Sequence, residues 1–144
     1  MHRDSPIGLE AKLLAIETIL VVDSRAHRKT LKDLLTTVGY QVVFASIEST
    51  LSSGFSPQDD PVAILLPWHR GKMLPQAACR AIRQASFNVP LIVVGPRTQT
   101  GAKVKLLESG ADDYIEEPFD NLELIARLRA AIRRSRLRAL EAHQ

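Results

Sequence analysis

The sequence predicts an α/β fold, a doubly wound parallel sheet of five strands with helices on both faces. The first observation is Val62–Leu66, an apolar run with a proline on each side. Its lack of polar alternation and its shortness favour a strand buried on both faces over a buried helical segment. The second is that apolar runs alternate with amphipathic segments, as in sheets built with right-handed helical crossovers. The third is size, because 144 residues, 45% of them hydrophobic, suffice for one domain with a core.

The chain begins with residues 1–17, which we expect to be an extension to the domain. Within it, Gly8–Ile16 has apolar residues spaced for one helix face. The first strand, Thr18–Val22, ends at Asp23. Ser24 is a suitable N-cap for the helix that follows.

That helix has apolar residues spaced at i, i+3, i+4 and i+7: Leu31, Leu34, Leu35 and Val38. Gly39 is expected to end it, since glycine tolerates the left-handed backbone of a helix terminus. Gln41–Ala45 is the predicted second strand, and the serine-rich segment Ile47–Ser53 is a weak helix. The central strand lies in Pro61–Trp68.

After the basic loop that starts at His69, the next helix is expected to turn five residues inward: Met73, Ala77, Ala78, Ala81 and Ile82. Cys79 falls in this apolar stripe and is expected to fill the core. Pro90 opens the fourth strand, Leu91–Val94, and the following Gly-Pro pair is expected to break it. The fourth helix is marked by three apolar residues and ends at Gly110: Ala102, Leu106 and Leu107.

The fifth strand is Asp113–Glu116. The last helix begins near Asp120 and is expected to run to about Ala142. Its expected inward residues are Leu122, Ile125, Leu128 and Ile132.

Composition narrows the classes of function. No apolar run approaches the ~20 residues that span a bilayer, and the N-terminus lacks the apolar core of a signal peptide. Cys79 is the single cysteine, which excludes an internal disulfide and a cysteine metal cluster. We therefore expect a cytoplasmic protein without cofactor, metal or membrane contact. From Arg127 onward the chain contains six arginines and one glutamate. This charge favours a solvated helix or linker, although basic tails can also contact nucleic acid or membrane.

In parallel α/β sheets, ligand sites lie at the carboxyl ends of the strands. Three sequence motifs cover the first, fourth and fifth predicted strands: I-L-V-V-D at Ile19–Asp23, V-P-L-I-V-V at Val89–Val94, and G-A-D-D-Y-I-x-x-P-F at Gly110–Phe119. With them, residues 18–138 resemble the receiver domains of two-component response regulators, and in particular the OmpR/PhoB branch. The resemblance implies a CheY-like, flavodoxin-like sheet with strand order 2-1-3-4-5. Residues 139–144 would then be a tail toward an effector domain.

The family's site holds magnesium with two acids after strand one and accepts phosphate on an aspartate after strand three. It also uses a serine or threonine after strand four and a lysine before the proline of strand five. The resemblance maps these positions to Asp23, Ser24, Pro67, Gly95 and Glu117. Only Asp23 keeps its type, proline has no nucleophilic oxygen, and one acid is a poor magnesium site. We therefore expect a pseudo-receiver that is phosphorylation-independent, with no catalytic residue.

A carboxylate replaces the family's lysine, so we expect Glu116 or Glu117 to pair with a nearby cation. The candidate cations are Arg25, His69, Arg70 and Arg97.

The resemblance also implies a dimer face made of the fourth helix, the last strand and the last helix. Three ion pairs across a two-fold axis map to residues of the required sign: Lys103 with Glu123, Asp113 with Arg127, and Asp112 with Arg134. The alternative is ordinary surface charge. Tyr114 takes the position of the family's switch aromatic, and Gly95 leaves room for its ring to fold inward. The alternative there is a plain surface tyrosine.

We thus expect a signalling domain that homodimerises and passes its state through the last helix to an effector. In this branch the effector is a winged-helix DNA-binding domain that controls transcription. The alternative is an adaptor that binds a partner protein through Trp68, His69 and Arg70 without dimerising. An enzyme is the weakest interpretation, since no nucleophile–base pair can be assembled.

Overall fold

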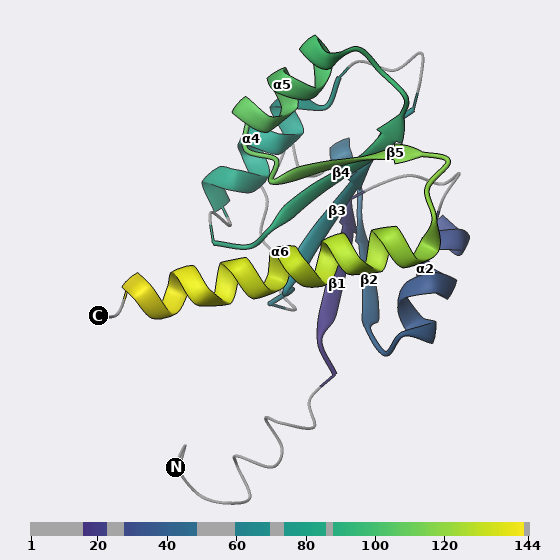
Figure 1. Ribbon diagram of the computed structural model, residues 1–144, viewed down its shortest axis with the longest axis vertical. Coiled ribbons are helices and arrows are strands. Elements are labelled where there is room, and N and C mark those ends of the chain that lie inside the picture. The colour runs from purple at the N-terminus through teal and green to yellow at the C-terminus, as the bar shows by residue number, and fades with distance from the viewer. Residues whose placement is uncertain (1–15, 23–27, 49–59, 70–73, 86–87, 143–144) are drawn as a thin grey trace, which may run out of the picture.

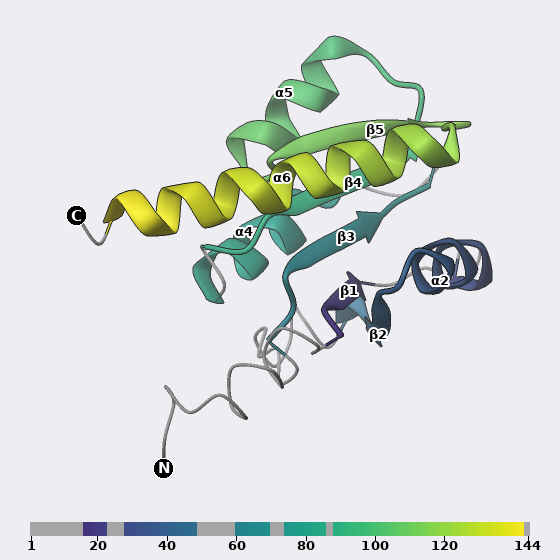
Figure 2. The same ribbon diagram turned by 60° about the horizontal axis from the view of Figure 1, so that its bottom comes forward.

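The computed structural model describes residues 16–22, 28–48, 60–69, 74–85 and 88–142. They contain one sheet of parallel strands in the order β2-β1-β3-β4-β5, which confirms the predicted fold and strand order (Figure 1). The strands are β1 Thr18–Val22, β2 Gln41–Ala45, β3 Ala63–Pro67, β4 Leu91–Pro96 and β5 Asp113–Glu117. The helices are α2 Arg28–Thr37, α4 Gln76–Ala85, α5 Thr100–Glu108 and α6 Asn121–Ala142. Helices α2 and α6 cover one face of the sheet, and α4 and α5 cover the other (Figure 2).

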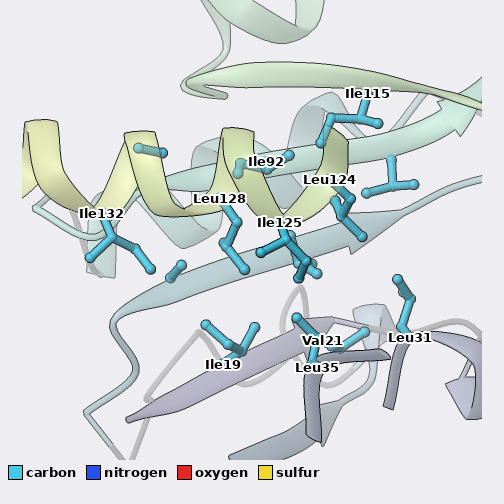
Figure 3. Close-up of a cluster of buried hydrophobic side chains, with 14 residues drawn as sticks. Ile19, Val21, Leu31, Leu35, Ile92, Ile115, Leu124, Ile125, Leu128 and Ile132 are labelled. Carbon is cyan, nitrogen blue, oxygen red and sulfur yellow. The ribbon is translucent and has the colours of Figure 1, made fainter. Parts of the chain in front are cut away.

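The central strand β3 is buried along its whole length, as the apolar run predicts. Its side chains alternate between two cores. Ala63 and Leu65 lie in the core under α2 and α6, whereas Ile64 and Leu66 lie in the core under α4 and α5. Figure 3 shows the first of these cores, where Leu128 of α6 packs over the strands. Because β3 contributes to both cores, both helix layers rest on it.

Two glycines end helices where the sequence predicts an end. Gly39 has a φ of 102° after α2, and the Tyr40 N–H donates to the Leu35 carbonyl at 3.0 Å. Gly110 has a φ of 122° after α5, and the Ala111 N–H donates to the Leu106 carbonyl at 3.1 Å. A side chain would strain either backbone, so both residues fix where the next strand starts.

Some boundary and side-chain predictions are wrong. Gly95 and Pro96 do not break β4 but stay paired with β5, because proline is tolerated at the end of a strand. Ala77 and Leu122 are exposed rather than inward, Leu122 by 81%. Each lies early in its helix, away from the buried stripe, and the inward positions go to residues two places later, Cys79 and Leu124.

Several predictions fall outside the described residues. They are the Gly8–Ile16 helix, the Ser24 cap, Met73 and most of Ile47–Ser53. Helix α6 ends at Ala142, as predicted. In the described parts of the chain, every helix is too short or too polar to traverse a bilayer.

Cys79 is fully buried on α4, which agrees with its expected place in the core. Burial raises the pKa of its thiol to about 11, against the opposing charges of Arg83 and Arg80. We expect a thiol reagent to label this single cysteine near neutral pH only when the domain unfolds. Labelling with Ellman's reagent, with and without urea, checks this, and rapid labelling of the native protein would contradict it.

Candidate functional site

The carboxyl ends of the parallel strands form one edge of the sheet, the rim. Strand β3 reaches it at Pro67, β4 at Pro96 and β5 at Glu117, which precedes a cis peptide bond. Asp23, Ser24 and Arg70 lie outside the described residues. Pro67 is buried and aligned with Val94 of β4. Its side chain has no oxygen, so it offers no nucleophile for phosphate.

The indole of Trp68 occupies the space in front of Gly95. The Trp68 backbone N–H donates to the Val94 carbonyl at 2.9 Å, which anchors the residue beside β4. A Cβ atom on Gly95 would lie 2.3 Å from Nε1 and 2.6 Å from Cδ1 of Trp68. Carbon and nitrogen atoms do not approach so closely without repulsion. The ring therefore fills the position to which the resemblance assigns a switch hydroxyl.

Tyr114 reaches the same place from β5. Its side chain is only 7% exposed, and its hydroxyl donates to the Pro96 carbonyl at 2.5 Å. The hydroxyl oxygen would lie 2.8 Å from a Cβ atom on Gly95. Tyr114 is therefore folded inward, which does not fit a plain surface tyrosine.

The Trp68 indole N–H is buried and has no hydrogen-bond partner among the described residues. A buried donor without an acceptor costs about 1–3 kcal/mol. Packing against Gly95, rather than a polar contact of the ring, therefore holds the indole in place.

Glu116 forms an ion pair with Lys103 of α5. The hydrogen bond from Lys103 is the main cause that lowers the pKa of the Glu116 carboxyl, and the charge of Arg97 adds to it. The expectation that a carboxylate here finds a cation is thus met, but the principal partner is not one of the four candidates. The Lys103 ammonium also lies 5.6 Å from the centre of the Tyr114 ring, so one cation serves two rim residues.

Replacing Lys103 by glutamine should raise the pKa of the Glu116 carboxyl toward its ordinary value. Because the folded-state pKa lies below the unfolded value, the pair stabilises the fold above the unfolded pKa. That contribution disappears as the pH falls through the folded pKa. An NMR titration of the carboxyl carbon measures the shift, and Lys105→Gln on the same helix is the control. Equal titration in both variants would rule out the Lys103 contact.

The charged residues of the expected dimer pairs lie on α5, on β5 or just before it, and on α6, which together form the α5–β5–α6 face. Within one chain, Arg127 contacts Asp113 and Glu123, each at 3.1 Å. Asp112 instead contacts Arg83 at 2.8 Å and accepts the Leu91 N–H at 2.8 Å. A second copy would have to share these carboxylates with their partners in the same chain.

Sequence reasoning missed Arg83. Its guanidinium donates to the Val89 carbonyl at 2.7 Å and to the Gly110 carbonyl at 3.0 Å, besides its contact with Asp112. It thus joins α4 to the segments that lead into β4 and β5. Arg83 directly follows the buried Ile82, a position compatible with either solvent or this contact, so the helical pattern gave no signal.

The described residues do not suit magnesium. No group of three or more His, Cys, Asp or Glu side chains is placed to hold a metal ion in the described ranges. Pro67 supplies only a backbone carbonyl, and Glu116 is committed to Lys103. Magnesium prefers several carboxylate and water oxygens in octahedral geometry.

Comparisons with known proteins agree with this fold. No family model matches the chain. The probable transcriptional regulator ycf27 of Guillardia theta is 36% identical over 143 residues, which cover 99% of this chain and 54% of that protein. Response regulator MprA of Mycobacterium ulcerans (strain Agy99) is 32% identical over 129 residues, 90% of this chain and 55% of that protein. The chain is a response regulator receiver domain.

Solved structures show the same receiver fold. A response regulator receiver domain protein from Clostridium thermocellum superposes with a TM-score of 0.72 at 20% identity, covering 85% of this chain and 98% of that one. NtrX from Brucella abortus superposes with a TM-score of 0.75 at 23% identity, covering 90% of this chain and 29% of that one. This receiver resembles OmpR/PhoB-type regulators and spans about half the length of the curated relatives it matches.

Proposed function

We propose that this receiver domain signals without phosphorylation of its rim. The observation that carries the proposal is the contact between Trp68 and Gly95, beside a proline at the acceptor position. An aspartyl phosphate needs a carboxylate, a cation and space for the phosphoryl group. At the rim, Pro67 has no carboxylate, and the indole of Trp68 occupies the space in front of Gly95. The negative charge of Glu117, at the position where the family has a lysine, supports the same proposal.

The test is exposure to acetyl phosphate, or to beryllofluoride, with magnesium. We expect no covalent mass increase and no change in oligomeric state. A receiver that has the acceptor aspartate, treated in parallel, should gain one phosphoryl group. A mass increase on this chain that maps to the rim would overturn the proposal.

The proposed output is control of transcription by a homodimer that pairs its α5–β5–α6 faces. Charged residues of the required sign lie on that face, and Val104 and Leu107 of α5 are 42% and 44% exposed beside them. Exposed ion pairs contribute only about 0–1 kcal/mol each, so the apolar residues would supply most of the affinity and the charges the orientation. The effector would be a DNA-binding domain reached through α6. Residues 1–17 as an extension and 139–144 as a tail belong to the same proposal.

Light scattering after size-exclusion chromatography tests the dimer. We expect a dimer that Arg127→Glu dissociates, because the new charge would oppose Asp113 and Glu123 of both copies. Arg129→Glu is the matched control, since Arg129 is exposed elsewhere on α6.

A monomer at high concentration would favour the adaptor alternative, in which Trp68, His69 and Arg70 bind a partner protein. The burial of the indole beside Gly95 leaves that alternative less of the Trp68 surface.

A further inference from the structure

The C-terminal part of α6, which runs past the edge of the sheet, is called the overhang. It forms one wall of a groove on the side of the domain away from the rim. Leu124, Leu128 and Ala131 form the buried stripe that seats α6 on the sheet. The same stripe continues with small residues, Ser135, Ala139 and Ala142, where the helix runs past the edge of the sheet (Figures 1 and 2). Helical spacing keeps all of them on one side of α6.

The opposite wall comes from two connections. Asn88 and Val89 lead into β4, and Gly110 and Ala111 lead into β5. The Ser135 hydroxyl donates to the Asn88 carbonyl at 2.7 Å, which ties the start of the overhang to the domain. The two walls line a groove of about 540 Å³. This volume lies within the range of about 300–1,000 Å³ that is typical of ligand pockets.

Apolar, polar and basic residues line the groove together. Its apolar lining residues come from both walls and include Leu107, which is 44% exposed, with Val89, Ala111, Ala139 and Ala142. Arg138 lines the groove and makes no ion pair within the described part of the chain. Asp112 lines it too, but Arg83 neutralises this carboxylate at 2.8 Å. The groove thus offers apolar side chains beside the positive charge of Arg138.

We propose that this groove docks an acidic segment of a partner protein, which inserts an apolar side chain between α6 and Leu107 and pairs a carboxylate with Arg138. Charge complementarity selects this occupant, because Arg138 lines the groove and Arg134 lies one helical turn before it on the same side of α6. A helix with the same charge, such as α6 of a second copy, is repelled.

The arrangement of the arginines disfavours nucleic acid. At about 100° per residue, Arg127, Arg134 and Arg138 lie on one side of α6. Arg129, Arg133 and Arg136 lie on the opposite side, and Arg136 is paired with Glu17. A duplex draws its affinity from many phosphate contacts on one surface, which this distribution does not provide.

The test uses the whole chain, labelled with nitrogen-15, and a synthetic helical peptide of about 15 residues with leucines at i and i+3 flanked by glutamates. We expect saturable shifts of the Leu107, Ala111 and Ala139 amides. Ala139→Trp, which fills the groove from an exposed position, and Arg138→Glu should each weaken binding by about tenfold or more. Arg129→Glu is the charge-matched control on the other side of α6 and should bind within about twofold. Circular dichroism confirms that each variant is folded.

Several results would overturn the proposal. One is the absence of shifts at these amides up to millimolar peptide. Another is equal binding to the Ala139→Trp variant, or equal binding of a peptide whose leucines are replaced by serine, since either places the contact outside the groove. Larger shifts of the same amides with a DNA duplex would assign the surface to nucleic acid. Shifts that depend on protein concentration alone would assign it to a second copy. None of these readouts depends on phosphorylation. Leu107 also borders the proposed dimer face, so the Ala139→Trp and Arg138→Glu variants, which change no residue of the proposed dimer pairs, separate the two proposals.

Discussion

Replacing Gly95 by alanine is expected to destabilise the folded domain by about 1–3 kcal/mol, the usual effect of an extra methyl group in a filled space. The new Cβ atom would lie 2.3 Å from Nε1 of Trp68 and 2.8 Å from the Tyr114 hydroxyl. Either the indole or the strand must move. The described part of the chain gives the indole N–H no hydrogen bond, so the ring should swing into water.

Trp68 is the single tryptophan, so its fluorescence reports this movement directly. We expect a red shift of the emission in Gly95→Ala and a lower midpoint in urea. Gly101→Ala is the control, because no described atom outside its own stretch of helix lies within 4 Å of its Cβ position and alanine favours the helix in which Gly101 lies. In a Trp68→Ala background the Gly95→Ala change should be much less destabilising, which gives a coupling energy of about 1–2 kcal/mol. Additive effects, or a native emission spectrum in Gly95→Ala, would contradict the contact between the two residues.

This coupling changes how the rim is understood. Gly95 could be taken as a position that had merely lost a hydroxyl. In the structure, the indole could not occupy its place if Gly95 had a side chain. Tyr114 shares that space and lies beneath the Lys103 ammonium, so the rim and the α5–β5–α6 face are in contact through named side chains. The proposed signal therefore has a physical route from the rim to the α5–β5–α6 face.

The sequence predicts the backbone of the domain well for a physical reason. A parallel sheet buries its strands on both faces, so its strands are short apolar runs such as Thr18–Val22. Left-handed glycines then mark the ends of helices, as Gly39 and Gly110 do. Both signals are local in the sequence, so they can be recognised without knowledge of the tertiary structure.

The partners of long polar side chains could not be predicted in the same way. Lys103 can reach several carboxylates from α5, and only the geometry shows that Glu116 is its partner. Arg83 contacts residues 27 and 29 positions away in the chain, which no helical period encodes. The filling of the rim by Trp68 belongs to the same class, because it depends on how two neighbouring strand ends meet. What the sequence supplied there was the residues, not their contacts.

Leu128→Ala should have the largest effect on stability, about 2–5 kcal/mol, because it leaves a cavity where α6 meets the sheet. Leu128 is fully buried in the core under α2 and α6. Leu122→Ala makes the same chemical change on the same helix, but Leu122 is 81% exposed, so we expect a change within about 0.5 kcal/mol. Urea unfolding followed by Trp68 fluorescence measures both.

The comparison of these two leucines tests the orientation of α6, since a helix rotated so that Leu122 faced inward would reverse the two values. The same comparison separates the effect of a substitution on folding stability from its effect on partner binding by α6. If α6 carries the signal as a rigid rod, its seating by Leu128 must hold while its far end engages an effector or an acidic partner. Leu128→Ala should therefore weaken peptide binding at the groove in proportion to the unfolded fraction. Leu122→Ala should leave that binding unchanged, because Leu122 lies at the opposite end of α6 from Arg138.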